Sequence, residues 1–373
     1  MPSEGVSVVK VKSKRDKARF IAFPYTFYQD DPHWVPPLRV AEQERFDPRK
    51  NPFYQHAVVE LFLAQRGGRV VGRVAAIDDD NHNATHGDNL AFFGFFEAVD
   101  EAVAAALFGT VEAWARIRGR STLRGPANPS MNDSSGFQLD AYDTDPYLMM
   151  PSNPPSYPRY AEAAGYEKAK DLYAWFFDHR SADMERLARL AARVEKRYRP
   201  TVRTADIKRF DDELGIVKRL YNGAWEDNWG FVKYTGAEFD ALGRELKFIV
   251  DPDIIVFLEL DGEVVGLSLA LPDANQVFKK MKGRLLPFGW IHYLRRKSLV
   301  DQARLPIVGV VKEHRNKGFE LVLMYETLRR ARAKGYMQGE ASWILEDNDG
   351  INKSIAAAGA TLYKTYRLYQ KSL

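Results

Sequence analysis

The chain contains two copies of one pattern, and this repeat limits its possible folds more than any other feature. Residues 61–72 and 257–266 both read as a strand, a glycine-containing hairpin turn and the start of a second strand with Val-Val-Gly. Three pairs of glycines keep their order along both copies: Gly72 with Gly266 at a separation of 194 residues, Gly119 with Gly335 at 216, and Gly165 with Gly359 at 194. The matches predict two copies of one α/β unit, the second carrying 22 additional residues (216 minus 194) after Gly266.

The repeat divides the chain into two predicted domains, residues 1–180 and residues 200–373. Between them, residues 181–199 carry apolar side chains at helical spacing, and Pro200 ends this pattern, so we expect a joining amphipathic helix. A length of 373 residues suits two domains of roughly 100–200 residues each. With 45% hydrophobic and 13% aromatic residues, the chain can build packed cores.

Composition excludes several classes of function. The formal net charge of +4 is only mildly basic, so we expect no nucleic-acid partner. The absence of cysteine excludes disulfides, a thiol nucleophile and cysteine-based metal sites, and the scattered histidines predict no metal site. The amino-terminal segment lacks a signal-peptide core, and no apolar run approaches the roughly 18 residues of a spanning helix. We therefore expect a cytoplasmic protein that is soluble or peripheral at the inner face of the inner membrane.

A basic loop between an apolar run and a helix predicts a phosphate site. The run Ile307–Val311 ends at His314-Arg315-Asn316-Lys317-Gly318, and helical spacing of apolar residues follows directly. Such a turn directs backbone N–H groups and the positive end of a helix dipole at one point, where a phosphate or pyrophosphate binds. Gly318 allows close backbone approach, while Arg315 and Lys317 supply positive charge.

These residues resemble the signature of the GNAT superfamily of acyl-CoA-dependent N-acyltransferases. That signature, Arg/Gln-x-x-Gly-x-Gly/Ala after the fourth strand, binds the pyrophosphate of coenzyme A, and here it reads Arg315-Asn-Lys-Gly318-Phe-Glu320. The final small residue is replaced by Glu320, which places a carboxylate near the expected phosphates. The resemblance implies tandem GNAT-like domains, each a mixed, mostly antiparallel sheet flanked by helices, with acyl-CoA as co-substrate. It implies that the following residues bind the cofactor: Val310, Val311, Arg315, Asn316, Lys317, Gly318, Phe319, Asn348 and Asn352.

The first copy departs from this pattern at the same place. Its corresponding run, Phe93-Gly-Phe-Phe-Glu97, leads to Asp100 and Glu101 and has neither the arginine nor the second glycine. Carboxylates at a helix start suit the helix dipole but repel pyrophosphate. We therefore expect the first domain to be non-catalytic and the second to be the catalyst.

Amine acylation needs a base for the amine and polarisation of the carbonyl, and the leaving thiolate can use an acid. Glu346 and Asp347, just past an apolar strand, are candidate bases. Tyr366, in a closing strand that also holds Tyr363 and Tyr369, is the candidate acid. The alternatives are a polar turn with a helix cap for the carboxylates and packing for the tyrosines. Without cysteine, direct transfer in a ternary complex is the simpler route.

An aromatic loop in the second domain is the candidate acceptor site. The segment Trp225-Glu226-Asp-Asn-Trp229-Gly-Phe231 follows a predicted helix, where GNAT proteins usually shape the acceptor pocket. Its rings could receive an apolar tail, and Glu226 an ammonium group. The alternative is an aromatic loop that caps the core.

The additional residues of the second copy form a basic and aromatic insert. The insert has no acidic residue between Phe278 and Lys297, and Pro287 with two glycines predicts two short helical pieces. This pattern is typical of a segment that rests on an anionic membrane, although a lid over the site is an alternative and nucleic acid would tolerate the same chemistry. The predicted membrane contacts are Phe278, Lys279, Lys280, Trp290, Arg295 and Arg296.

Two further segments refine the resemblance. The tandem layout, Trp343-Ile-Leu-Glu-Asp-Asn348 and the closing Gly359-Ala-Thr-Leu-Tyr-Lys-Thr-Tyr-Arg-Leu-Tyr369 are similar to a bacterial group that includes the bacterial ceramide synthases. This resemblance implies transfer of a fatty acyl group from long-chain acyl-CoA to the amine of a sphingoid base such as 3-oxosphinganine. Two alternatives remain: acetylation of a small soluble amine or peptide, and a non-catalytic CoA-binding scaffold.

Overall fold

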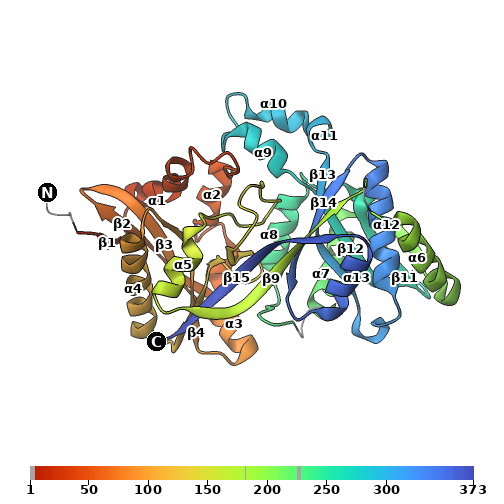
Figure 1. The fold of residues 1–373 in the computed structure, drawn as a ribbon, viewed down its shortest axis with the longest axis horizontal. Coiled ribbons are helices and arrows are strands. Elements are labelled where there is room, and N and C mark those ends of the chain that lie inside the picture. The colour runs from red at the N-terminus through yellow and green to blue at the C-terminus, as the bar shows by residue number, and fades with distance from the viewer. Residues whose placement is uncertain (1–4, 181, 225–227) are drawn as a thin grey trace. The chain divides into compact units, whose positions relative to one another are not determined.

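The chain packs into two compact units, and a computed structural model describes residues 5–180, 182–224 and 228–373 (Figure 1). Unit 1 comprises Met1–Leu172, Met281–Gly289 and Thr365–Leu373, and unit 2 comprises Tyr173–Lys280 and Trp290–Lys364. The predicted limits at residues 180 and 200 describe copies along the sequence, whereas the compact units interleave segments of both copies. Those limits therefore stay a prediction.

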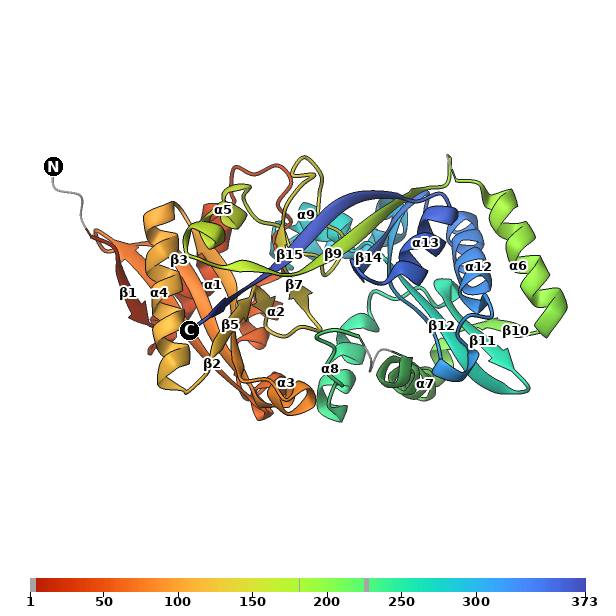
Figure 2. The same cartoon turned by 60° about the horizontal axis from the view of Figure 1, so that its bottom comes forward.

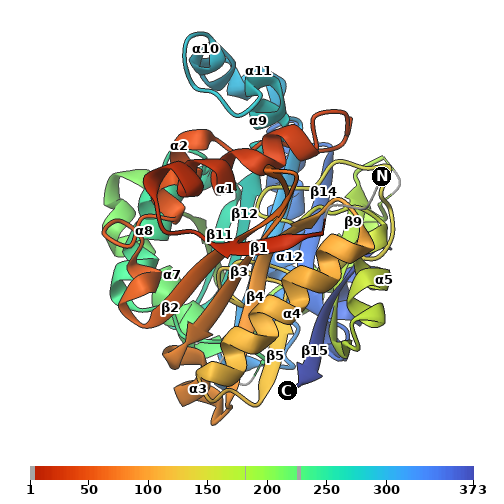
Figure 3. The ribbon, with the colours of Figure 1, turned by 90° about the vertical axis from the view of Figure 1, so that its left-hand side faces the viewer.

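Unit 1 is built on strands in the order β1-β2-β3-β4-β5-β15. Helix α4 packs on β3 and β4, crossing these strands in Figure 3, and it buries an aromatic core that includes Phe93, Phe96 and Phe108. The helices and strands that begin in its first segment, Met1–Leu172, are β1 (Ser7–Lys10), α1 (Lys14–Phe27), α2 (Arg39–Arg45), β2 (Ala57–Arg66), β3 (Arg69–Asp79), α3 (Asp80–His86), β4 (Leu90–Ala98), α4 (Glu101–Ile117), β5 (Thr122–Gly125), β6 (Ala127–Asn128), β7 (Ser134–Ser135), β8 (Phe137–Gln138), α5 (Ser156–Ala163) and β9 (Glu167–Asp178).

Unit 2 has strands in the order β9-β14-β13-β12-β11-β10. Helices α6 and α12 pack together on one side of its sheet, while α7 packs on β12 and β13 (Figure 2). The remaining elements are α6 (Met184–Tyr198), β10 (Thr201–Thr204), α7 (Phe210–Ala224), α8 (Gly236–Leu246), β11 (Ile255–Leu260), β12 (Glu263–Pro272), α9 (Asn275–Met281), α10 (Gly289–Leu294), α11 (Arg296–Leu299), β13 (Gln302–Val310), α12 (Phe319–Ala333), β14 (Gln338–Leu345), α13 (Asp349–Ala357) and β15 (Thr361–Ser372).

The element boundaries confirm the predicted repeat. Strand β3 begins 194 residues before β12 (69 and 263), α4 ends 216 residues before α12 (117 and 333), and β9 begins 194 residues before β15 (167 and 361). The separations are those of the three glycine pairs. The prediction of two copies of one α/β unit, each a mostly antiparallel sheet flanked by helices, is therefore confirmed.

The additional residues of the second copy lie between β12 and β13. In the first copy, β3 and β4 are joined only through α3 and Gly87-Asp88-Asn89. In the second, α9, α10 and α11 fill the connection, three short helices instead of the two expected, because the chain breaks helical pattern at Arg295 as well as near Pro287. The insert is therefore the largest structural addition to the second copy.

Candidate active site

The fourth and fifth strands of unit 2 part midway along their length. Strands β13 and β14 are parallel partners over Gln302–Leu305 and Gln338–Ala341, and the described ladder between them ends there. On its other side β13 stays paired with β12 as far as Val310, with a register shift between Leu269 and Leu271. Such an irregularity in register bends one strand relative to its neighbour. The sheet therefore has an opening beside residues 306–310.

Backbone donors on β13 face this opening. The N–H of Val311 donates to the carbonyl of Val265 at 2.9 Å, toward β12. Because successive N–H groups of a strand alternate in direction, those of Val310 and Val308 point the other way, toward β14. Of the two predicted cofactor contacts here, Val310 therefore offers its N–H to the opening, while the N–H of Val311 is already used.

The basic loop leads from this opening to the start of α12. Eight residues, 311–318, join β13 to α12, and Gly318 occupies the amino-terminal cap position with φ of 81° and no side-chain cap. Gly318 thus lacks the side-chain carboxylate or hydroxyl that usually accepts from the first N–H groups of a helix, and the only acidic group in this turn, Glu320, accepts from its own backbone N–H. Lys317 Nζ lies 2.8 Å from His314 Nδ1, which keeps its charge beside the loop. Phe319 is fully buried and anchors the helix start.

Glu320 lies where the GNAT signature has a small residue. Burial raises the pKa of its carboxyl, and a hydrogen bond from its own backbone N–H, together with the positive charge of Arg315, partly offsets this effect. A raised pKa eases protonation of the group, which would reduce its repulsion of phosphate. The buried environment of Glu320 therefore reduces the electrostatic repulsion that this departure from the signature introduces.

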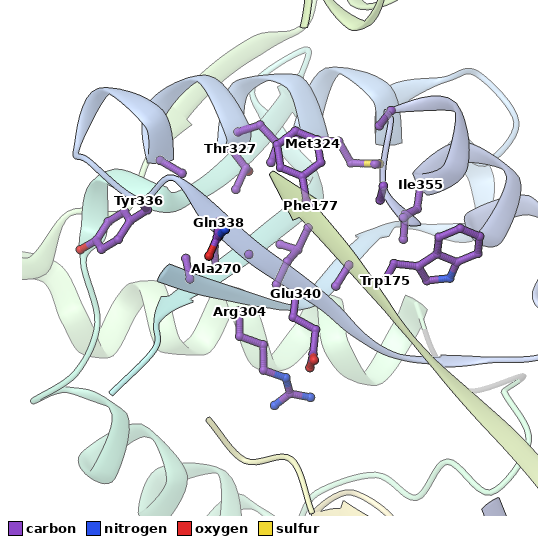
Figure 4. A pocket seen from close by; sticks show the side chains of 18 of the residues that line it. Trp175, Phe177, Ala270, Arg304, Met324, Thr327, Tyr336, Gln338, Glu340 and Ile355 are labelled. Atoms are coloured by element: carbon purple, nitrogen blue, oxygen red, sulfur yellow. The ribbon is translucent and has the colours of Figure 1, made fainter. Parts of the chain in front are cut away.

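A buried polar cluster lies just before the strands part. The guanidinium of Arg304 donates to Ser342 Oγ at 2.9 Å and to the Ser342 carbonyl at 2.8 Å. Ser342 and Tyr363 both donate to the carboxylate of Glu340, in two short hydrogen bonds. Arg304, Glu340 and Ser342 are each at most 4% exposed. Figure 4 shows Arg304 and Glu340 extending from the strands away from Met324 and Thr327 of α12.

Sequence reasoning did not identify this cluster. Its signal was present, since Gln338, Glu340 and Ser342 alternate along one face of β14. However, their partner Arg304 is recognisable only once the β13–β14 register is known. The Glu340 carboxylate and the Tyr363 hydroxyl are hydrogen-bonded to each other next to the opening. A carboxylate and a hydroxyl are groups that can accept and donate a proton.

The predicted catalytic residues are spread more widely. Glu346 and Asp347 follow β14 directly, in the turn before α13, with Glu346 half-buried and Asp347 exposed. Tyr366 is fully buried and belongs to unit 1, whereas Tyr363 belongs to unit 2. The roles assigned to Glu346, Asp347 and Tyr366 stay predictions.

Two asparagines fix the exit of β14. Asn348 caps α13 by accepting from the N–H of Ile351 at 3.3 Å, as the capping alternative anticipated. Asn352 accepts from Trp175 Nε1 at 2.9 Å and donates to the carbonyl of Leu345 at 3.0 Å. These hydrogen bonds hold β9, β14 and α13 together. Contact of either asparagine with a cofactor stays a prediction.

The predicted acceptor loop is described only in part. Trp225 and Glu226 lie outside the described residues. Phe231 is 7% exposed and packs on Tyr221 with ring centroids 5.2 Å apart, while Trp229 is half-buried. The described part of this loop therefore holds an aromatic cluster next to α7.

The insert exposes large apolar side chains. Of the predicted membrane contacts, Trp290 is 44% exposed, Lys280 and Arg295 are exposed, and Phe278, Lys279 and Arg296 are half-buried. Their neighbours Leu286 and Phe288 are more exposed still, at 72% and 71%. Sequence reasoning named four basic residues with Phe278 and Trp290, and did not single out Leu286 and Phe288.

The corresponding opening in unit 1 is filled by the chain itself. There β4 and β5 are partners only over Leu90–Phe92 and Thr122–Arg124, so these strands also part. Beyond that point Asn128 Oδ1 accepts from the N–H of Phe95 at 2.5 Å. A Cβ atom at Gly94 would lie 1.8 Å from the Ala127 carbonyl oxygen, so the backbone here is in close contact.

The helix start of unit 1 is also occupied. Asp100 caps α4 by accepting from the N–H of Val103 at 2.9 Å, and Arg66 donates to it at 2.8 Å. The hydrogen bonds from Arg66 hold the pKa of Asp100 below its usual range, so the carboxylate is charged. A fixed negative charge occupies the position where a phosphate would bind.

Within residues 5–180, 182–224 and 228–373, no cluster of three or more His, Asp or Glu side chains is suited to hold a metal ion. No helix in the same ranges is long and apolar enough to cross a membrane.

Known proteins define the class to which these features belong. No protein-family model matches the chain. In structure it is similar to a tandem GNAT protein from the clavulanic acid biosynthesis pathway, with a TM-score of 0.57, 15% identity and 98% of both chains covered. In sequence it is 38% identical over 379 residues to the bacterial ceramide synthase of Caulobacter vibrioides, covering 99% of this chain and 98% of that protein. It is 37% identical over 369 residues to protein YghO of Escherichia coli, covering 97% and 94%.

The fold is that of a tandem GNAT protein, and the similarity to a bacterial ceramide synthase places the chain among the acyltransferases. Within that class, the chain belongs to the family that includes the bacterial ceramide synthase of Caulobacter vibrioides.

Proposed function

We propose that this acyltransferase moves a fatty acyl group from long-chain acyl-CoA to the amine of a sphingoid base. The observation that carries the proposal is the opening between β13 and β14 beside an uncapped, basic helix start, in a chain 38% identical to a bacterial ceramide synthase. The uncapped N–H groups suit a pyrophosphate, and the N–H of Val310 suits a thioester carbonyl. Arg315, Asn316, Lys317, Gly318 and Phe319 would hold the CoA phosphates, and Asn348 and Asn352 the pantetheine arm.

Transfer would be direct. The amine nitrogen, once deprotonated, attacks the thioester carbonyl; a C–N bond forms, the C–S bond breaks, and the CoA thiolate takes up a proton. Glu346 or Asp347 would accept the amine proton, and Tyr366 would return one to the thiolate. The Glu340–Tyr363 pair is a further candidate for the same proton transfers, because its groups lie at the opening in hydrogen-bond contact. Trp225, Glu226, Trp229 and Phe231 would receive the acceptor.

An assay by mass spectrometry tests the function. Purified protein is incubated with palmitoyl-CoA and 3-oxosphinganine, and in parallel with acetyl-CoA and soluble amines. An N-acyl sphingoid product supports the proposal, whereas turnover only with acetyl-CoA and a soluble amine would replace it with the soluble-amine alternative. CoA binding without any turnover would favour a scaffold.

Variants then separate the proton-transfer candidates. Glu340→Gln and Tyr363→Phe remove one group each from the buried pair, and Glu346→Gln, Asp347→Asn and Tyr366→Phe remove the others. Loss of a true base should lower kcat by about 10²–10⁴-fold and displace the acidic limb of the kcat profile. A residue that only supports packing should instead lower the melting temperature and leave the pH profile in place.

The lipid substrate gives the insert a proposed role at an anionic membrane surface. Basic residues near such a surface each contribute about 1 kcal/mol, and exposed apolar side chains add to this by entering the interface. The exposed Leu286, Phe288 and Trp290 among basic residues support this role.

A further inference from the structure

An apolar cavity lies between α12 and the sheet of unit 2. The space inside it that the centre of a water-sized molecule can occupy is about 50 Å³. Helix α12 supplies Met324, Thr327, Leu328 and Ala331. Figure 4 shows Trp175 of β9 at the opposite end from Tyr336, with Phe177 between them. The remaining lining residues are His179, Ala270, Ala303, Arg304, Leu305, Gln338, Gly339, Glu340, Ala341, Ile355, Ala358 and Ala360.

Small side chains create this space. Seven of the lining residues are alanine or glycine, contributed by four strands and two helices or their ends. Interiors are normally packed without gaps, so a concentration of small residues around one volume leaves room for a ligand. Burial lowers the pKa of His179 to about 4, so its imidazole is uncharged at neutral pH, and the side chains of Arg304 and Glu340 extend away from α12 (Figure 4). Thr327 satisfies its hydroxyl by donating to Ser268 at 2.7 Å. The cavity therefore suits an aliphatic ligand.

The cavity begins where the strands part. Leu305 and Ala341 form the last partner pair of the β13–β14 ladder, and both line the cavity. Helix α12 runs back along β13, since Phe319 at its start packs with Val310 and Ala331 near its end packs with Ala303. The basic loop, the opening and the cavity therefore follow one another along α12. A ligand with phosphates at the loop and its thioester at the opening would have its chain directed into the cavity.

We propose that this cavity holds the fatty acyl chain of the donor, with Ala303, Ala331 and Tyr336 at its far end limiting the chain length. The inference rests on the proposed function. A sphingoid base also carries an aliphatic chain, but the polar groups suited to an amine, Glu340 and Tyr363, meet on the other side of the strands from α12. We therefore assign the cavity to the donor chain.

A pair of alanines on α12 provides a matched test. Ala331 is 6% exposed and lines the cavity, whereas Ala333, two residues further on, is exposed. Ala331→Leu should lower the ratio of kcat/KM for palmitoyl-CoA to that for octanoyl-CoA by tenfold or more, while Ala333→Leu should leave it unchanged. Leu328→Ala, which enlarges the cavity and creates no steric clash, should shift the ratio toward longer chains.

The outcomes separate this inference from the proposed function. An unchanged ratio in folded Ala331→Leu and Leu328→Ala would overturn the inference, as would a changed preference for the chain of the sphingoid base instead of the acyl chain. If the wild type transfers no acyl group, the proposed function fails, and competition binding of palmitoyl-CoA against CoA decides the cavity separately. Ala331→Leu should then lose the added affinity of the palmitoyl chain and keep that of CoA, and equal losses for both would overturn the assignment.

Discussion

The two units share one architecture, but they differ in what occupies the opening between their fourth and fifth strands. In unit 1 the opening holds Asn128, whose amide oxygen accepts from the N–H of Phe95 at 2.5 Å. In unit 2 the corresponding residue, Val310, has no partner on β14 in the described ladder. An amide carbonyl of the protein thus occupies in unit 1 the kind of position that we assign to a thioester carbonyl in unit 2.

The helix starts differ in the same sense. Two residues join β4 to α4, and the second of them, Asp100, caps the helix. Eight residues join β13 to α12, they include Arg315 and Lys317, and Gly318 provides no side-chain cap. One copy therefore satisfies its own N–H groups at both places where the other has donors suited to a ligand. A duplicated fold can lose ligand binding by filling the site with its own polar groups, without any change of topology.

The largest expected effect comes from reversing a charge at the loop of unit 2. Arg315→Glu should lower kcat/KM for acyl-CoA by about 100-fold or more, equivalent to about 2.7 kcal/mol, because a charge-assisted contact to phosphate becomes a repulsion. Arg69→Glu makes the same charge change at an exposed residue in the β2–β3 hairpin of unit 1 and serves as the control. Steady-state kinetics checks both variants. Equal losses in the two would mean that the loop of unit 2 is no more a phosphate site than that of unit 1.

The sequence predicted the differences between the units only where they depend on residues close together in the chain. Arg315, Gly318 and the carboxylates at Glu97, Asp100 and Glu101 lie next to a helix start, so their pattern predicted which copy has a basic loop. The Asn128 contact joins residues 33 positions apart, and the Arg304–Ser342 contact joins residues 38 apart. Such partners depend on strand register, which composition and spacing do not determine. The candidate bases Glu346 and Asp347 were proposed from their place in a turn, and their role stays a prediction.

The insert, which only the second copy has, should contact an anionic membrane. Replacing both Leu286 and Phe288 with serine should weaken binding to anionic phospholipid vesicles by about tenfold or more, because burying each apolar side chain contributes on the order of 1.5–3 kcal/mol. Ile117→Ser removes an apolar side chain that is 86% exposed at the end of α4, in the copy without an insert. Vesicle co-sedimentation measures both. Unchanged binding in the double variant, or an equal loss in Ile117→Ser, would reject the insert as the membrane contact.

Replacing Asn128, which occupies the opening of unit 1, should lower stability and leave catalysis unchanged. Asn128→Ala leaves the N–H of Phe95 and the carbonyl of Ser134 without their partner, so the free energy of unfolding should fall by about 1–3 kcal/mol. Asn89→Ala, which breaks two hydrogen bonds at an exposed side chain, should cost less because water replaces the partners. Denaturant unfolding checks the stability, and kcat/KM of the folded Asn128→Ala protein should stay within about twofold of wild type. A large loss of activity at unchanged stability would show that unit 1 takes part in catalysis.

The smallest effect concerns Glu320. Its carboxyl group lies at the proposed phosphate site of unit 2, as Asp100 lies at the helix start of unit 1. Burial raises the pKa of Glu320, so its charged form, which opposes phosphate binding, predominates only above that raised pKa. Affinity for CoA should therefore rise as the pH falls through the pKa of Glu320, and Glu320→Gln should bind CoA a few-fold more tightly than wild type at pH 8, about 1 kcal/mol or less. Calorimetric titration across pH provides the ratio of the two Kd values, in which the titration of the CoA phosphates cancels. The ratio should approach one at acidic pH; a constant ratio, or weaker binding by Glu320→Gln, would mean that Glu320 favours the bound phosphates as a hydrogen-bonding group and does not repel them.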